Sequence, residues 1–462
     1  MIDAARRAVE AAAKAGAGEA EAYAAEDSGR EVRVHGGAVE SLTAATQRGL
    51  GVRAWIGKRV GYAYGTDLSA PGIAALAERA TEAARVADED EFAGAPSPDA
   101  AASGRHSADV QGQSAPEGLE GLSDPTIGEW STGRLAELAL EIERTALSAD
   151  PRIAGVEQAV YADSSERVAI ASSTGIEGEY SSSSCYGYLQ ALAEGEDGRE
   201  TGLGFGLGRG PAALEPAAIG REGAERALAM IGAGKPASRA CPVVLDPTVA
   251  ASFIGLVGRG LSASAVQRGR SPFAGRAGEE VAGEALTLYD DGLDPEGFAS
   301  SPFDAEGVPR RRTPLVEART LRTYLYDTYT ARRGDAASTG SASRAGYRSQ
   351  PSVSTSNLIV APGSLGFAEL LGEAGEGVLV TDVAGLHSGV NPVSGVFSVG
   401  ASGRAIRGGE LAEPLREFTI ASDLVSMLRA VRAVGTDARW VPFSGSVKTP
   451  SLLIGEMTVA GS

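Results

Sequence analysis

The side chains best suited to metal binding or nucleophilic catalysis are few and widely spaced in this sequence. It contains three histidines, His35, His106 and His387, and two cysteines, Cys185 and Cys241. A metal site carried by one helix needs two ligands about one turn apart. No two histidines are that close, so the sequence predicts no such pair. Two cysteines are too few for a disulfide framework, and we expect reduced thiols that pack as small apolar residues.

Independent serine catalysis and phosphate binding are also disfavoured. The sequence has no Gly-x-Ser-x-Gly nucleophile elbow, and serines beside glycines, such as Ser394, usually bond to backbone groups in turns. Glycines alternate from Gly202 to Gly210, with no Gly-Lys-Ser/Thr after them. This alternation predicts a strand with one bare face rather than a phosphate loop.

His387 is the histidine with a candidate functional setting, because it lies in the glycine-rich run 385–391. Two interpretations stay open. The imidazole is either hydrogen-bonded inside the turn or exposed in a channel that admits a peptide. His106 lies in the acidic, Pro/Gly/Ser-rich segment 88–128, where we expect a solvated side chain in a loop or linker.

Composition limits the classes of partner. The chain has 462 residues and a formal net charge of −18, which disfavours a nucleic-acid surface because such surfaces concentrate Lys and Arg. No apolar run reaches the roughly 20 residues that cross a bilayer. The N-terminus also lacks a signal-type apolar core. We therefore expect a cytoplasmic protein with neither a nucleic-acid nor a membrane partner.

The elements that would position these residues occur in two similar sets. Each set is a helix, several strands and a second helix, over about 2–86 and 131–231. The expected fold class is α+β. Residues 1–235 would form an N-terminal α/β domain of two similar helix-strands-helix layers, and residues 236–462 a mainly antiparallel β C-terminal domain.

The segment 241–275 has the clearest local signals in the second half. A short apolar strand leads to Asp246 and Pro247, which suit the N-cap and first turn of a helix with one buried face. Further on, we expect a Tyr/Leu-rich strand or hairpin within 315–333. A short helix near the C-terminus would bury Leu424, Met427, Leu428, Val431 and Val434 on one face.

Several motifs resemble the TldD/PmbA family of metallopeptidases, once labelled modulators of DNA gyrase. They are Gly260-Leu261, Arg268-Gly269, Phe273-Ala274-Gly275, Ser338-Thr339-Gly340-Ser341-Ala342 and the order of loops and strands over 377–462. In the TldD branch, the helix before Gly-Leu carries His-Glu-x-x-x-His. Here the six positions are Ile254, Gly255, Leu256, Val257, Gly258 and Arg259. The resemblance therefore indicates the TldE (PmbA) branch.

This replacement removes the groups that metal hydrolysis uses. Zinc needs imidazole or anionic ligands, and peptide hydrolysis needs a carboxylate base beside the bound water. Ile254 cannot ligate, Gly255 cannot act as a base, and Arg259 would repel a cation. The resemblance also implies a cysteine near the C-terminus of TldD that completes the metal site, and no cysteine follows Cys241 here.

The resemblance thus implies a subunit with no catalytic or metal-binding residue of its own, acting in a TldD/TldE-type metallopeptidase complex on unfolded or leader peptides. Zinc would reside in the TldD-like partner. Candidate residues for a peptide channel or a partner-facing surface are His387, Asn391, Ser394, Arg344 and Arg259. Two alternatives stay open: a self-associating peptide-binding protein, as a homodimer, without a protease partner, and a metallopeptidase with an atypical carboxylate site.

Overall fold

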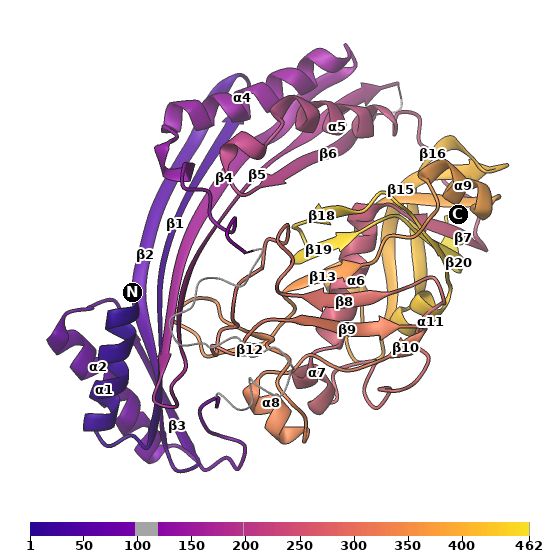
Figure 1. Cartoon of the computed structure of the whole chain (residues 1–462). Coiled ribbons are helices and arrows are strands. Elements are labelled where there is room, and N and C mark those ends of the chain that lie inside the picture. Colours follow the sequence, from indigo (N-terminus) through magenta and orange to yellow (C-terminus); the bar gives the residue numbers. More distant parts are fainter. Residues whose placement is uncertain (98–118, 197, 462) are drawn as a thin grey trace.

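The computed structural model describes residues 1–97, 119–196 and 198–461. It consists of an N-terminal α/β domain and a β-rich C-terminal region, and the long N-terminal sheet curves round one side of that region (Figure 1). The expected fold class is therefore confirmed. The domain boundary near residue 235 stays a prediction.

The two helix-strands-helix sets of the N-terminal half are present, but they are not two layers. They lie side by side in one antiparallel sheet of order β3-β2-β1-β4-β5-β6, because β1 and β4 pair along their length. The first set is α1 (Ile2–Lys14), β1 (Glu19–His35), β2 (Ala38–Ile56), β3 (Arg59–Gly65) and α2 (Ala70–Val86). The second is α4 (Thr132–Ala149), β4 (Ile153–Ser172), β5 (Glu177–Gly195), β6 (Gly198–Gly208) and α5 (Pro216–Leu228).

Alternation along the strands separates the two faces of this sheet. On β1, Ala22, Ala24, Val32 and Val34 belong to the clusters that the helices cover. Tyr23, on the opposite face, packs in a cluster with residues of the C-terminal region. All four helices accordingly lie on the side of the sheet away from that region (Figure 1).

The alternating glycines form strand β6, as the sequence predicts, and their bare face touches helix α5. A Cβ atom on Gly204 would lie 2.1 Å from the carbonyl oxygen of Ile219, and one on Gly202 would lie 2.2 Å from the amide nitrogen of Ala227. The glycines therefore let the helix backbone rest directly on the strand backbone.

The C-terminal half contains two six-stranded sheets with helix α6 (Pro247–Gly260) between them (Figure 1). One sheet has the order β16-β15-β14-β7-β20-β17 and the other β10-β9-β8-β13-β19-β18. Pairing is antiparallel except between β7 and β14 and between β13 and β19.

The strands of the first sheet are β7 (Arg239–Leu245), β14 (Gly377–Ala384), β15 (Val396–Arg407), β16 (Glu410–Asp423), β17 (Val431–Val434) and β20 (Leu452–Ala460). Those of the second are β8 (Leu288–Asp291), β9 (Arg312–Glu317), β10 (Thr320–Leu321), β13 (Asn357–Val360), β18 (Arg439–Val441) and β19 (Ser446–Thr449). A small pair is β11 (Ala342–Ser343) and β12 (Ser352–Val353). The remaining helices are α7 (Ala263–Gln267), α8 (Thr328–Arg333), α9 (Phe367–Ala374), α10 (Leu386–Gly389) and α11 (Leu424–Arg429).

Three local expectations for this half need correction. Helix α6 starts as expected, with the Asp246 carboxylate accepting the amide of Val249, but it is buried on nearly all sides rather than on one face. The expected Tyr/Leu-rich strand or hairpin is present only as the short hairpin of β9 and β10, and helix α8 follows because Asp327 forms a capping box that starts a helix. Helix α11 ends at Arg429, so Val431 and Val434 lie in β17.

The expected acidic loop 88–128 is described only at its two ends, and His106 lies outside the described residues. The first end is fixed against the rest of the protein. Lys58 Nζ donates to the carbonyl of Ala93, and the Arg332 guanidinium donates to the carbonyls of Gly94 and Ala95. The second end includes a 3₁₀ turn at Ile127–Glu129. No helix within the described ranges is long and apolar enough to cross a membrane.

A buried charge network joins the N-terminal sheet to the C-terminal region. Arg53 on β2 makes ion pairs with Glu21 on β1 and, at 3.0 Å, with Glu306; Arg344 also pairs with Glu21. The Glu21 and Glu306 side chains are at most 3% exposed. Removing one partner of such a network leaves an uncompensated buried charge, which costs about 3–5 kcal/mol. The network therefore fixes how the two parts meet.

Asp304 lies beside this network and holds the turn that carries Glu306. Its carboxyl oxygens accept the amides of Glu306, Val308 and Ala342 at 2.8–3.0 Å. Burial, with the nearby charge of Glu306, raises the pKa of Asp304 to about 7. For Glu306 itself, the same burial opposes ionisation, but Arg53 and the Thr328 amide overcome it and lower its pKa.

The contact between β6 and α5 yields a stability prediction. Gly204→Ala should lower the free energy of unfolding by about 1–3 kcal/mol or more, because the added methyl group overlaps the helix backbone. Gly155→Ala is the matched control, since a Cβ on that strand residue has no heavy atom within 4 Å. Urea unfolding of both variants tests this, and equal stabilities would contradict the contact.

The Asp304 carboxyl should make stability depend on pH. Its folded pKa lies above the ordinary value of about 3.9 for an aspartate. The folded state therefore holds a proton that the unfolded chain has released, and stability should fall as pH rises from about 4 to 7. In urea unfolding at about pH 5 and about pH 8, Asp304→Asn should lose less stability with rising pH than the wild type. Asp437→Asn, which removes another carboxylate bonded to a backbone amide, should behave as the wild type does. Equal losses in all three proteins would refute a role for Asp304.

Candidate functional site

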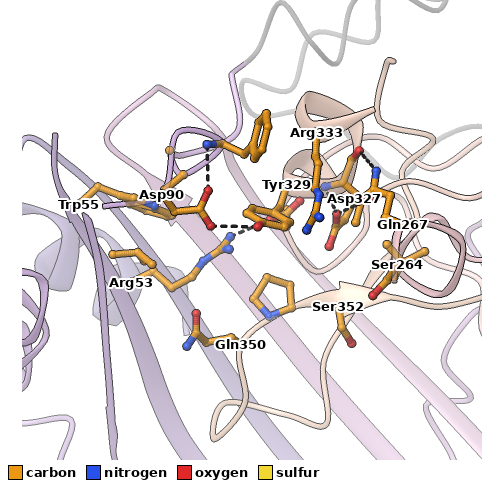
Figure 2. Close-up of a pocket in the computed structure, with 18 of the residues that line it drawn as sticks. Arg53, Trp55, Asp90, Ser264, Gln267, Asp327, Tyr329, Arg333, Gln350 and Ser352 are labelled. Atoms are coloured by element: carbon orange, nitrogen blue, oxygen red, sulfur yellow. Dashed lines mark hydrogen bonds and ion pairs between the residues drawn. The ribbon is translucent and has the colours of Figure 1, made fainter. Parts of the chain in front are cut away.

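A cavity of about 260 Å³ lies where the N-terminal domain meets the C-terminal region (Figure 2). The end of β2 and the loop 90–94 form one wall; helices α7 and α8 and the segment 350–353 form the other. The lining residues are Arg53, Trp55, Val60, Asp90, Phe92, Ala93, Gly94, Ser264, Gln267, Arg268, Glu306, Asp327, Tyr329, Thr330, Arg333, Gln350, Pro351, Ser352 and Val353.

Charged side chains of both signs face this cavity. Arg53 and Glu306 belong to the buried network. Asp327 accepts the amide and hydroxyl of Thr330 at 2.8 and 2.7 Å, and burial, together with Glu306, raises its pKa. The Tyr329 hydroxyl donates to Asp90 at 2.9 Å, which joins the two walls (Figure 2).

This arrangement can hold a polar group by hydrogen bonds and charge. None of the lining residues is a histidine or a cysteine. The acidic groups of the cavity are already bonded to Arg53, to Tyr329 or to the start of α8. The cavity is therefore best described as a polar recess in the junction between the two parts.

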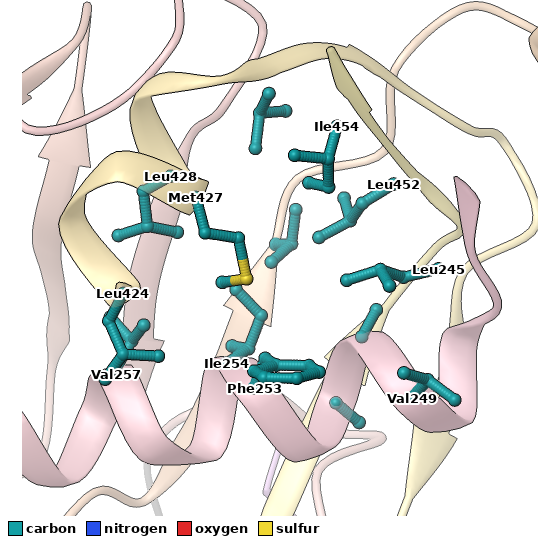
Figure 3. Close-up of a cluster of buried hydrophobic side chains, with 14 of the residues drawn as sticks. Leu245, Val249, Phe253, Ile254, Val257, Leu424, Met427, Leu428, Leu452 and Ile454 are labelled. Atoms are coloured by element: carbon teal, nitrogen blue, oxygen red, sulfur yellow. The ribbon is translucent and has the colours of Figure 1, made fainter. Parts of the chain in front are cut away.

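Two of the helix positions that correspond to the metal motif, Ile254 and Gly255, are packed into the core. Ile254 has no exposed surface and lies in a cluster with Phe253, Leu424 and Met427 (Figure 3). A Cβ on Gly255 would lie 2.8 Å from Cβ of Ser444 and 3.0 Å from its carbonyl oxygen, so no side chain fits there without a shift of the segment that carries Ser444.

Arg259 lies on a different side of α6 from Ile254, because it is exposed whereas Ile254 is enclosed. The two positions therefore do not converge on one point. Over the residues that the structure describes, no three His, Cys, Asp or Glu side chains lie close enough to hold a metal ion together. The donor set of this chain does not fit a zinc ion at α6.

Three of the five candidate residues lie in one exposed loop. His387 is on α10 and is exposed; Asn391 Oδ1 accepts the amides of Val393 and Ser394; and Ser394 Oγ accepts the amide of Val396. Asn391 and Ser394 thus shape the loop. The His387 side chain is on the surface, and a hydrogen bond of its imidazole within the turn stays a prediction. A contact with peptide or partner stays a prediction.

The other two candidates, Arg259 and Arg344, differ in exposure. Arg259 is exposed at the end of α6. The Arg344 side chain has no exposed surface, since it pairs with Glu21 and donates from Nε to the carbonyl of Ala305 at 3.0 Å. Arg344 therefore serves the junction, and the expectation that it faces a peptide or partner does not fit its position. None of the five candidates lines the cavity of Figure 2.

The residues of the buried network were not predicted from the sequence. Glu21 and Arg53 stand in Ala-, Val- and Gly-rich strands, and a charged residue inside such a run is the available signal of a paired buried charge. Their partners Glu306 and Arg344 are more than 250 positions away in the sequence. The pairing therefore could not be inferred from spacing.

Comparison with known protein families agrees with this architecture. Residues 20–84 match the PmbA/TldA metallopeptidase domain 1, residues 125–231 the central domain, and residues 238–461 the C-terminal domain.

Relatives and solved structures match over nearly the whole chain. The metalloprotease PmbA of Escherichia coli O157:H7 is 28% identical, with 96% of this chain and 92% of that protein covered. The PmbA homologue of Haemophilus influenzae is 28% identical, with 98% and 95% covered. A Thermotoga maritima structure, named as a candidate modulator of a DNA gyrase, has 26% identity, a TM-score of 0.88 and 99% of each chain covered. TldE from Thermococcus kodakarensis shares the fold with a TM-score of 0.89 at 22% identity, over 99% of this chain and 100% of that chain.

The three domain matches follow one another along most of the chain, and the relatives match over nearly its whole length. The chain therefore belongs to the TldD/PmbA family of metalloprotease-like proteins, which includes TldE.

Proposed function

We propose that this chain is a TldE/PmbA-like subunit without a metal site of its own, in a cytoplasmic TldD/TldE-type peptidase complex. A TldD-like partner would bind zinc, supply the carboxylate base and hydrolyse unfolded or leader peptides. This chain would contribute structure and peptide-contacting surface. The names of its relatives support a role in proteolysis, since PmbA is described as a metalloprotease.

The observation that carries the proposal is the packing of α6. Metal hydrolysis requires ligands at fixed positions and a base within reach of the bound water. At the matching positions, Ile254 is part of the core and Gly255 is pressed against Ser444. Both places are filled by the protein itself, which supports the loss of a catalytic centre here.

The loop 385–396 supports a surface role. Besides the exposed His387, it carries Val393 and Val396, which are 52% and 55% exposed. These two valines give the loop that carries His387 exposed apolar surface. We therefore keep His387, with Asn391 and Ser394 as the residues that shape the loop, and the exposed Arg259, as candidates for contact with the peptide or the partner subunit.

Reconstitution tests the proposal directly. The purified chain alone should hydrolyse neither unfolded nor leader peptides. Added to a TldD-like protein that carries His-Glu-x-x-x-His, it should associate with that protein and peptide cleavage should appear, in a zinc-dependent manner. A partner whose motif glutamate is replaced by Gln is the control and should associate without cleavage.

Two results would contradict this account and favour an alternative. Hydrolysis by the chain alone, with one zinc per chain, would indicate a metallopeptidase with an atypical site. Failure to associate with any TldD-like protein, combined with binding of peptides, would indicate a peptide-binding protein that works without a protease.

Restoring the motif should not restore a metal site. The triple variant Ile254→His, Gly255→Glu, Arg259→His should bind no zinc and should unfold at a lower temperature, because it places polar groups in the core and overlaps Ser444. Arg259→His alone is the matched control and should keep wild-type stability, since Arg259 is exposed. Metal analysis and thermal unfolding give the answer. One zinc per chain at wild-type stability would disprove the packing argument.

A further inference from the structure

The acidic side chains of the junction cavity are already engaged by the protein (Figure 2). The two oxygens of Asp90 accept bonds from a backbone amide and from the Tyr329 hydroxyl. Those of Glu306 are bonded to Arg53 and to another backbone amide. The third acid, Asp327, accepts two bonds from the first turn of α8, and burial raises its pKa, which favours the uncharged carboxyl. These acids therefore leave little negative charge with which to bind a cation.

Two arginines of the same cavity are not engaged in this way. Arg268 directly follows α7 and Arg333 ends α8, and both are exposed. Within the described ranges, neither guanidinium forms an ion pair. The ends of the two helices are held together, because Gln267 Nε2 donates to the carbonyl of Thr330 at 2.7 Å. The two guanidinium groups thus belong to the same wall of the cavity and have donors to offer to a ligand.

This distribution of charge favours a ligand with one carboxylate group. A guanidinium presents several N–H donors in a fixed arrangement that matches a carboxylate or a phosphate. The cavity also contains the charged acids Asp90 and Glu306. They repel a phosphate, which carries about two negative charges, more strongly than a carboxylate, which carries one. The mixed charges therefore select the smaller anionic charge.

The remaining lining residues suit a ligand with amide groups and an apolar part. Trp55 and Val353 supply apolar surface. Ser264, Gln350 and Ser352 face the cavity, and their side chains form no hydrogen bond with any residue of the described ranges (Figure 2). Small-molecule sites combine apolar walls with a few polar groups and are common at domain interfaces. The volume of about 260 Å³ is below the roughly 300–1,000 Å³ typical of such sites, so the ligand must be small.

We propose that this cavity binds the C-terminal end of a short peptide. The carboxylate would be held by Arg268 and Arg333, and the last side chain would pack against Trp55. Gln350 and the two serine hydroxyls would bond to the peptide groups. None of the positions 254–259 that correspond to the metal motif lines this cavity. The choice of a peptide, rather than another small carboxylic acid, rests on the role in proteolysis proposed above.

Titration calorimetry of the full chain, without any partner protein, tests the ligand. The dipeptide alanyl-phenylalanine should bind, with one molecule per chain. Its C-terminal amide should bind about tenfold more weakly or worse, because it lacks the charge that the arginines recognise. Inorganic phosphate should not bind. Hexanoate, which has the carboxylate but no peptide group, should bind more weakly than the dipeptide.

Two variants test the residues. Arg268→Gln and Arg333→Gln should each raise the dissociation constant for the dipeptide about tenfold or more, because each removes one of the two charges that face the carboxylate. Both side chains are exposed, so thermal unfolding should not change. Arg270→Gln is the matched control. It removes the same charge from an exposed arginine that does not line the cavity, and it should bind the dipeptide as the wild type does.

Four outcomes would overturn the site: no binding of the dipeptide, equal affinity for its amide, tighter binding of phosphate, or unchanged binding by both cavity variants. Hexanoate that binds more tightly than the dipeptide would overturn the assignment to a peptide. Reconstitution with a TldD-like protein is a separate measurement. An active complex formed by a chain that binds no dipeptide would refute this site alone. A chain that binds the dipeptide but joins no TldD-like protein would support the site and contradict the proposed function.

Discussion

Helix α6 is enclosed between two six-stranded sheets, and most of the C-terminal region depends on that enclosure. Strands β7 and β14 of one sheet and β13 and β19 of the other contact it. Glycines along the helix make this possible: a Cβ on Gly258 would lie 2.7 Å from Leu358, and one on Gly260 would lie 3.0 Å from Phe273. A helix packed this closely has little room for the polar groups that a hydrolytic metal site needs.

The N-terminal domain meets this β-rich body through charge as well as through apolar packing. Glu21 and Arg53 project from the inner face of the sheet, and Glu306 and Arg344 complete the network from the C-terminal side. Buried ion pairs are weak evidence for stability, because desolvation offsets much of their attraction. They do constrain the relative position of the two parts, however, since each buried charge needs its partner within pairing distance. The network therefore favours one arrangement of the two parts, and the polar cavity is a consequence of that arrangement.

Much of the fold follows from local sequence signals. Asp246 precedes a helix that starts where the sequence predicts, because its side chain accepts an amide of the first turn. Ser69 and Ser131 cap α2 and α4 in the same way. The glycines of β6 were interpretable because alternation identifies a strand with one bare face. The errors arose where tertiary packing decides. Apolar spacing alone could not tell that α6 has neighbours on nearly every side, or that Val431 and Val434 belong to a strand.

Residues of the candidate site could be predicted from the sequence only where the family resemblance assigns a role to a particular position. Ile254, Gly255 and Arg259 could be identified from their flanking residues, whereas Arg344 gave no local sign that Glu21, 323 positions away, would enclose it. The most direct test of the central claim is a crystal structure of this chain grown with zinc and measured at the zinc absorption edge. The account predicts no anomalous peak held by side chains of α6 or its neighbours. A zinc ion bound there by this chain's own residues would contradict it.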